Sequence, residues 1–455
     1  GLGGSGALTK SGLGTLTLTG ANSYSGATTI DAGVLDLPGS WNVGAGIATA
    51  SVAVGATFSG TGVLTASTLS LSGGGTVNLS GSNAVGAITT SGTLGAVTFN
   101  DAHALALGSL ASTGRIVVTT GNGFDLNVGS GAIATTSNSG NAIVLGSGHD
   151  LTLANGTSLI GASPVLTAAN AFINNAGASA VTATSGRWLI YSSAPGSDSF
   201  GGLDSGNTAL WNATYASRPP GSIGVAGNRY LFAMQPTLTF TPTSLGKTYG
   251  VDATAMLATS YAVSGYQSGA ANAFRGDSAA TAFAGSPLLT SSGAAATASV
   301  AGGPYAINLA QGSLVSAAGY AFGFGGPATL TVTPAPVTVR ALGGASVHGA
   351  LSFNPGLAAT GLQNGETVGV LTGLSNSFGI TPQTPVGSYM LSVAGTLTNT
   401  NYVVTGTSPA AWQVIPSDLP SLTPSVHVRA EWDCAAATVG SVSARSICGS
   451  RMSDR

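Results

Sequence analysis

Short runs of alternating apolar and polar residues, each ended by glycine, asparagine or serine, fill the stretch from Gly1 to Ser185 of this 455-residue chain. Alternation with a period of two is typical of half-buried β-strands, and helical periodicity is nearly absent. The runs recur roughly every 8–10 residues, and every other run lies about 19–27 residues from the last. No other property narrows the choice of folds as much, because that longer spacing is the length of one turn of a parallel β-helix.

We therefore predict an all-β protein whose residues 1–185 form a right-handed parallel β-helix. Valine, leucine and isoleucine would face inward, threonine, serine and asparagine outward, and glycine and asparagine would occupy corners that need a positive φ. The chain is 43% hydrophobic, so it can bury a large core although only 6% of its residues are charged. A β-sandwich is the alternative, but one sandwich rarely needs so many evenly spaced strands.

The segment 12–35, GLGTLTLTGANSYSGATTIDAGVL, closely resembles the passenger-associated transport repeat of autotransporters and related exoproteins. In that family the repeat is a pair of β-helix turns implicated in export of the passenger. The resemblance implies that this chain is exported, and only one good copy of the repeat is visible.

Residues 186–235 are richer in aromatic residues, proline and arginine. The segment 186–192 resembles a module that follows the β-helix in many exoproteins similar to filamentous haemagglutinin. We predict that its aromatic side chains cap the solenoid, which would otherwise expose strand edges. These aromatics could also stack on sugars, which is the alternative role for Trp188, Tyr191, Trp211, Tyr215 and Tyr230.

Residues 236–335 and 336–416 form an internal duplication, and each copy ends in an alternating strand followed by a proline, Pro334 or Pro416. Their pattern resembles the MBG (YDG-type) repeats that occur in tandem in bacterial exoproteins, which implies two small β-sandwiches. The second copy departs from the family at His348, where the family usually has tyrosine. The segments that align are 238–242 with 337–341, 248–250 with 347–349, 303–309 with 386–393, 319–322 with 401–404, and 330–334 with 412–416.

The C-terminal tail, residues 417–455, resembles none of these repeats, and we predict that it is disordered. Its prolines make a stiff spacer, and four arginines follow. It also holds both cysteines of the chain, Cys434 and Cys448, which a disulfide can join in an oxidising compartment. An incidental pair in a loose tail is the other interpretation.

Charge and hydropathy exclude several classes of partner. The net charge is −2, and the 12 lysines and arginines are scattered, so the basic cluster that nucleic-acid binding needs is missing. No apolar run reaches the length of a membrane-spanning helix. The chain begins at Gly1 without a signal-peptide pattern, and we expect an internal or C-terminal fragment whose export signal lies upstream.

Motifs for metal and nucleotide chemistry are incomplete. The histidines, His103, His149, His348 and His427, are far apart, and although His149 and Asp150 are adjacent, strand neighbours point to opposite faces. We therefore predict that the histidines are solvated turn residues rather than zinc ligands. The glycines of residues 1–6 lack the aspartate of a calcium-binding β-roll repeat. The segment 246–248 ends like a phosphate-binding loop, but its first glycine is replaced by Thr241 and no helix follows, so we predict a surface turn.

Catalytic carboxylates are equally scarce. No Gly-x-Ser-x-Gly motif occurs, and a polysaccharide-cleaving β-helix needs paired carboxylates. The separation of Asp101 and Asp125 along the chain falls within the spacing of one turn, so they could stack one turn apart as a catalytic or sugar-binding pair. Otherwise these aspartates bond to nearby amides in turns.

Together the resemblances imply a non-catalytic stalk or adhesin of a secreted bacterial surface protein, without cofactor or metal. Its expected partners are an outer-membrane transporter of the two-partner type and glycans or proteins on a host or neighbouring cell. Two alternatives stay open, a polysaccharide-active β-helix enzyme and a pure export or folding module of an autotransporter passenger.

Overall fold

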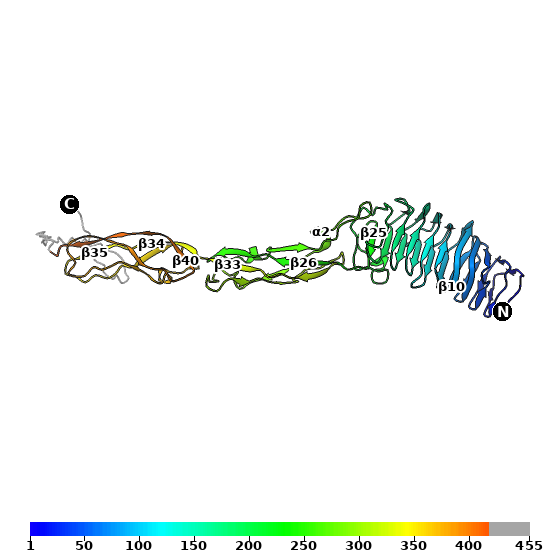
Figure 1. Cartoon of the computed structure of the whole chain (residues 1–455), viewed down its shortest axis with the longest axis horizontal. Helices are drawn as coiled ribbons and strands as arrows, with labels where there is room; N and C mark the ends of the chain where they lie inside the picture. Colours follow the sequence, from blue (N-terminus) through cyan, green and yellow to red (C-terminus); the bar gives the residue numbers. More distant parts are fainter. Residues whose placement is uncertain (418–455) are drawn as a thin grey trace, which may run out of the picture. The chain divides into compact units, whose positions relative to one another are not determined.

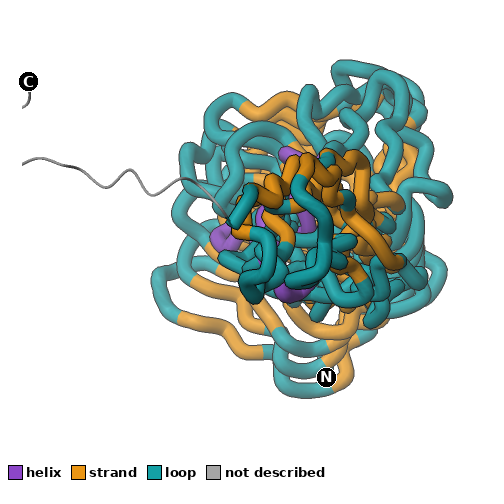
Figure 2. Tube along the Cα trace, turned by 90° about the vertical axis from the view of Figure 1, so that its left-hand side faces the viewer, coloured by secondary structure: helices purple, strands orange, loops and turns teal. Residues whose placement is uncertain are grey.

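The computed structural model describes residues 1–417, and it confirms an all-β protein with a parallel β-solenoid of about eight turns followed by small sheets (Figure 1). Figure 2 shows that strands and loops make up nearly all of these residues. The few helical turns are η1 (Pro220–Ser222), α1 (Thr254–Leu257), α2 (Ala279–Ala282) and η2 (Val368–Val370).

The solenoid strands pair in parallel, each with its counterpart in the next turn. The long strands β9 and β10 continue round a corner and so belong to two rows. From β11 onward a separate five-stranded sheet forms an additional wall. The strands are β1 (Leu8–Lys10), β2 (Thr15–Thr17), β3 (Ala21–Asn22), β4 (Thr28–Ile30), β5 (Val34–Asp36), β6 (Ser40–Asn42), β7 (Ile47–Val52), β8 (Thr57–Gly60), β9 (Val63–Gly73), β10 (Thr76–Ser91), β11 (Thr93–Leu94), β12 (Val97–Asp101), β13 (Leu105–Leu107), β14 (Leu110–Ser112), β15 (Ile116–Thr120), β16 (Leu126–Val128), β17 (Gly131–Thr135), β18 (Ile143–Ser147), β19 (Leu151–Leu153), β20 (Thr157–Gly161), β21 (Val165–Ala168), β22 (Phe172–Asn174), β23 (Val181–Ala183), β24 (Leu189–Ser192) and β25 (Arg229–Phe232).

The length of a turn can be read from the strand register. A step is the number of residues along the chain between two register partners in consecutive turns. The step from Val97 to its partner Ile116 is one of the shortest in its row, and the step from Ile116 to its partner Ile143 is the longest before β24. These two steps span the predicted spacing, and the other steps up to β24 fall between them, which confirms the prediction. The last step, from Leu189 to Arg229, is longer because a loop lies between β24 and β25.

Inward positions carry the apolar side chains, as in Leu126, Leu151 and Phe172, which are stacked in register and fully buried. Buried polar groups occur at corners, where they satisfy backbone amides. The amide oxygen of Asn83 accepts the Leu64 N–H at 2.9 Å. Such side chains replace main-chain partners that the corner removes from the ladder.

The first compact unit contains residues 1–335 together with 363–365 and 400–403. One buried core runs from Leu18 to Tyr320, so it continues past residue 235 into the first small sheets. The predicted limits at residues 185 and 235 stay predictions. The strands beyond the solenoid here are β26 (Thr237–Pro242), β27 (Leu245–Thr248), β28 (Tyr261–Ser264), β29 (Leu288–Thr290), β30 (Tyr305–Ala306), β31 (Asn308–Ala310), β32 (Ala321–Phe324) and β33 (Thr329–Thr333).

The second compact unit contains residues 336–362, 366–399 and the described residues from 404 onward. Its small core includes Ala341, Leu391, Trp412 and Val414. The strands that follow β33 are β34 (Ala335–Ala341), β35 (Gly344–Val347), β36 (Leu357–Thr360), β37 (Leu374–Asn376), β38 (Gly387–Leu391), β39 (Val393–Gly395), β40 (Tyr402–Ser408) and β41 (Ala410–Ile415).

The two sets of eight strands, β26–β33 and β34–β41, pair in the same way. The first set gives sheets β28-β26-β32, β27-β33-β30 and β29-β31, and the second gives β36-β34-β40, β35-β41-β38 and β37-β39. Each strand of the second set therefore takes the place of the strand eight positions earlier. The parallel pair β27–β33 and the antiparallel pair β33–β30 recur as β35–β41 and β41–β38.

Candidate functional site

Asp125, His149 and Asp150 converge at one corner of the solenoid, where consecutive turns enter β16 and β19. The Nδ1 atom of His149 lies 2.8 Å from Oδ1 of Asp125 and 3.6 Å from Oδ1 of Asp150. His149 lies in the bend before β19, as predicted for a turn residue, so the argument that strand neighbours point to opposite faces does not apply to His149 and Asp150.

The three side chains also hold the corner together. Asp125 Oδ1 accepts the Asp150 N–H at 3.1 Å, and Asp150 Oδ1 accepts the Ala171 N–H at 3.0 Å. The Asn170 side-chain amide donates to the same Asp150 oxygen at 2.8 Å. Each aspartate thus ties its own turn to the next turn of the solenoid.

Electrostatics at this corner follow from these contacts. The Asp150 N–H and then the His149 ring hold the pKa of Asp125 below its ordinary value. The hydrogen bond to Asp125 raises the pKa of His149. One ligand atom from each of Asp125, His149 and Asp150 lies within 4.8 Å of the others, so among residues 1–417 these three side chains are close enough to hold a metal ion together. Imidazole with carboxylates suits zinc and similar divalent metals.

Asp101, the other half of the predicted carboxylate pair, is not stacked on Asp125. Its register partner in the next turn is Thr120, and its partner in the preceding turn is Asn83. The side chain is fully buried, and its two oxygens accept the N–H groups of Val85 and His103, each at 2.8 Å. The possible pairing with Asp125 does not occur, because this turn is a short one and the chain is already back in register at Thr120, before it reaches Asp125. Asp101 instead bonds to nearby amides, which was the other interpretation of these aspartates.

Burial raises the pKa of Asp101 to about 6, and it does the same for Asp198, whose carboxylate accepts the Phe172 N–H and the Ser192 hydroxyl. Unfolding returns each pKa to about 3.8, so the native state binds more protons between pH 4 and 6. These protonated groups therefore make their full contribution to the free energy of unfolding below about pH 4, and this contribution is lost as the pH rises through 6.

We therefore expect the urea midpoint of the protein to fall between pH 4 and pH 7, with Asp101 alone contributing about 2–3 kcal/mol. Asp101→Asn removes the ionisable group, so the pH dependence should be clearly shallower in the variant. Urea unfolding at four pH values measures this. An unchanged pH dependence in the variant would contradict the raised pKa, because it would mean that Asp101 has the same pKa in the folded and the unfolded protein.

The predicted aromatic cluster divides into an inner and an outer group. Trp188, Trp211 and Tyr230 are buried in the continuous core, and the Tyr230 hydroxyl donates to the Leu203 carbonyl at 2.7 Å. Tyr191 is buried in a second, smaller core cluster, and Tyr215, which is 39% exposed, meets its ring edge to face at 5.8 Å beside an open pocket of about 360 Å³. Of these five aromatic residues, only Tyr215 is exposed enough to meet a sugar.

Lys247 does not lie in a surface turn, so that prediction is wrong. It belongs to β27, is buried, and its Nζ donates to the carbonyls of Val251, Ala294 and Ala295. Of the other predicted residues, His103 lies 3.9 Å from Asp101, and His348 Nδ1 lies 3.0 Å from the Thr384 carbonyl. Cys434, Cys448 and His427 lie outside the described residues, as does the predicted tail from residue 418 onward.

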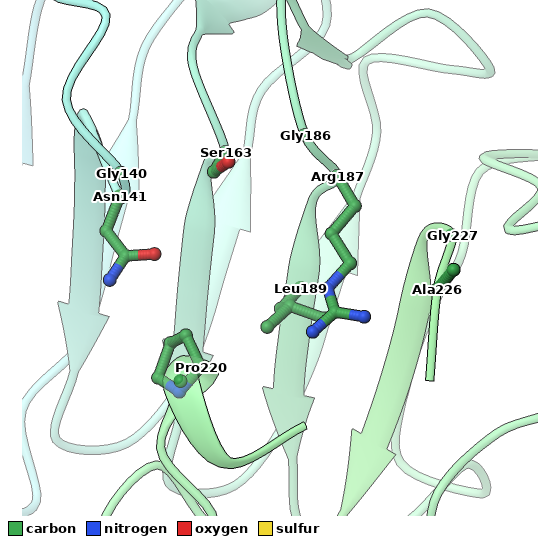
Figure 3. A pocket seen from close by; sticks show the side chains of 10 residues that line it. Gly140, Asn141, Ser163, Gly186, Arg187, Leu189, Pro220, Ala226 and Gly227 are labelled. Carbon is green, nitrogen blue, oxygen red and sulfur yellow. The ribbon is translucent and has the colours of Figure 1, made fainter. Parts of the chain in front are cut away.

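A second concave site, which the sequence analysis missed, is here called the Arg187 pocket. It has a volume of about 490 Å³ and is lined by Asn141, Ser163, Gly186, Arg187, Leu189, Pro220 and neighbouring small residues (Figure 3). Its parts come from three turns of the solenoid and from the loop before β25. No motif joins them in the sequence, because each turn contributes only one to three residues and these lie more than 20 residues apart along the chain.

Comparison with known families gives one match, the passenger-associated transport repeat, over residues 8–37. In the structure these residues are strands β1 to β5, in which Leu8 pairs with Thr28 and Thr15 with Val34. They thus form one complete turn and the start of the next, somewhat more than the segment 12–35 that the sequence analysis identified. No curated protein and no solved structure matches the chain.

The transport repeat and the β-helix together suggest the passenger domain of a secreted protein. The repeat implies export through an outer-membrane transporter. Within residues 1–417, no helix is long and apolar enough to cross a membrane.

Proposed function

We propose that this chain is a non-catalytic, adhesive stalk of a bacterial surface protein, exported by a transporter of the two-partner type. The observation that carries the proposal is the transport repeat built into the first turns of a continuous parallel β-helix. The duplicated sheets that follow would act as MBG-type spacers. Its partners would be glycans or proteins on a host or neighbouring cell.

The physical properties of the solenoid support a stalk. Ladders of parallel backbone hydrogen bonds run from turn to turn and give stiffness without charged side chains. The outward positions carry small polar residues, such as Thr29, Ser70 and Asn78. Such a repeating neutral surface suits weak contacts that gain strength by multivalency.

A pair of single-turn deletions tests the export part of the proposal. Deleting residues 8–27 from the full-length protein puts Thr28 in the place of Leu8, so it removes one turn of the transport repeat and keeps the register. Deleting 97–115 likewise removes one ordinary turn, because Ile116 replaces Val97. Both variants are expressed with the transporter in a Gram-negative host, and surface display is measured by antibody labelling of intact cells.

Each deletion shortens the solenoid by one turn, so a difference between the two variants reports the role of the transport repeat itself. We expect the 8–27 deletion to reduce surface display by about tenfold and the 97–115 deletion to leave it nearly unchanged. Equal display of the two variants would contradict an export role for the repeat. The non-catalytic part is tested on a panel of polysaccharides. Cleavage that disappears in an Asp125→Asn variant would replace the stalk with an enzyme.

A further inference from the structure

The Arg187 pocket lies where three successive solenoid turns bring a left-handed residue to the same corner. Asn141 has φ 56°, Ser163 has φ 48° and Gly186 has φ 71°. The turns are joined here by hydrogen bonds from the Ala142 N–H to the Ala162 carbonyl and from the Ser163 N–H to the Ser185 carbonyl, both 2.9 Å. Serine rarely adopts this conformation, and such residues concentrate at functional sites.

Glycine at position 186 keeps the corner open. A Cβ atom there would collide with the Ser163 hydroxyl, so any other residue would displace that side chain. Figure 3 shows Asn141 and Arg187 on opposite sides of the opening, with Ser163 above and Pro220 below. An amide, a hydroxyl and a guanidinium group therefore surround one space.

Arg187 brings a positive charge into the lining of the pocket, and Arg229 holds a second one beside it, close enough to Asp277 for that carboxylate to act on its charge. Arg187 Nη2 donates to the Ile223 carbonyl at 2.6 Å, and Arg229 donates to the carbonyls of Thr208 and Ala226, of which Ala226 lines the pocket. Considering residues 1–417 alone, neither guanidinium forms a salt bridge with a carboxylate, and the buried Nε of Arg229 has no hydrogen-bond partner. Burial and then the charge of Arg187 lower the pKa of Arg229.

The rest of the lining is apolar. Leu189, Pro220 and Ala226 present aliphatic surface beside the polar groups. A volume of about 490 Å³ falls in the range of small-molecule sites. A free phosphate or sulfate would leave the aliphatic surface uncovered, and a neutral sugar would leave the Arg187 guanidinium, which forms no salt bridge within residues 1–417, without a counter-charge.

We propose that the Arg187 pocket binds a carboxylate-bearing sugar residue of an acidic surface glycan. The planar guanidinium matches a carboxylate through paired hydrogen bonds. Asn141 and Ser163 would bond to ring hydroxyls, and Leu189 and Pro220 would cover the apolar face of the ring. The assignment rests on the proposed adhesive function and names its ligand class.

Binding of two tetrasaccharides to the purified full chain tests the proposal. A hyaluronan tetrasaccharide carries glucuronate carboxylates, and chitotetraose is a neutral chain of the same length. In titration calorimetry at low salt we expect hyaluronan to bind at least about tenfold more tightly, since a charge-assisted pair is worth more than about 1.4 kcal/mol. Equal affinity for the two tetrasaccharides would overturn the proposal.

Matched variants place the binding in this pocket. Arg187→Gln keeps a donor for the Ile223 carbonyl but removes the charge, and we expect a loss of affinity of about tenfold or more. Arg340→Gln makes the same change at an exposed position of β34 and should bind like the parent. Unchanged binding by a folded Arg187→Gln variant would overturn the assignment.

Asn141→Asp provides a second variant that leaves Arg187 in place. Aspartate tolerates the left-handed conformation as asparagine does, so the corner should keep its shape while its new charge repels a carboxylate. We expect it to lose hyaluronan binding too, and it decides the question if Arg187→Gln fails to fold. Competition by sodium sulfate as strong as that by sodium glucuronate would identify a simple anion site and overturn the sugar assignment. Surface display measures export separately from sugar binding. A failure of the proposed function can therefore be distinguished from a failure of the sugar assignment.

Discussion

Replacing Leu151 with aspartate should unfold the middle of the solenoid, whereas the same change at Thr152 should be tolerated. Leu151 is fully buried between Leu126 and Phe172 of the adjoining turns, and Thr152 is partly exposed. Neighbours in a strand point to opposite faces, so one substitution puts a charge in the core and the other beside water. A charge buried without a partner costs several kcal/mol or shifts its pKa until it is neutral.

We expect Leu151→Asp to lower the free energy of unfolding by at least about 4 kcal/mol at pH 7, and Thr152→Asp by less than about 1 kcal/mol. Urea unfolding followed by far-UV circular dichroism measures both values. If Thr152→Asp were as damaging as Leu151→Asp, the strand register of β19 would be wrong by one residue.

The alternation of residues was enough to predict which side chains form the core of the solenoid. In a strand such as 151–153 the apolar positions are the buried ones. Side chains alternate between the two faces of a strand, so once the apolar residues face the core, the side on which every other residue lies is fixed. Turn length was predictable only as a range, since corners accept loops of different size. For that reason the sequence left open whether Asp101 stacks on Asp125 or bonds to nearby amides, and the structure shows the second arrangement.

The corner residues were the least predictable part of the site. His149 and Asp150 lie between β18 and β19, as expected of turn residues, but the sequence does not show which corners of successive turns lie side by side, so their convergence on Asp125 was missed. Lys247 was missed for a different reason. Its charge suggests exposure, but three carbonyl oxygens at the edge of β27 replace its water shell.

The duplicated sheets were predicted from aligned tyrosines that have the same role in both copies. The hydroxyl of Tyr320 accepts the Gln267 N–H at 2.8 Å, and the hydroxyl of Tyr402 accepts the Gln363 N–H at 2.9 Å. A buried phenol needs a hydrogen-bond partner, so this contact constrains both residue and position. The longer middle of the first copy does not disturb the pairing, because loops between strands absorb it.

Trp211 should be the side chain whose loss most weakens the join between the solenoid and the first sheets. It is buried, stacks on Phe232 of β25 at 5.2 Å, and meets Phe274 and Tyr320 edge to face. Its Nε1 donates to Asp277 at 2.8 Å, and the Tyr320 hydroxyl donates to the same carboxylate oxygen at 2.7 Å. One ring thus links the last solenoid strand to the elements that follow.

We expect Trp211→Ala to lower the free energy of unfolding by about 3–5 kcal/mol, since it leaves a large cavity and removes a donor from the Asp277 carboxylate. Tyr215→Ala is the matched control, because that ring is 39% exposed and packs outside the core against Tyr191. Tyr215→Ala should lower the free energy of unfolding by less than about 1 kcal/mol. Urea unfolding measures the free energy of unfolding of both variants. Limited proteolysis near residue 235 should be faster in Trp211→Ala alone, because in that variant the solenoid can separate from the sheets before either part unfolds. Equal costs for the two variants would mean that the inner aromatic cluster does not stabilise this join, and that the ladder of strands alone holds it.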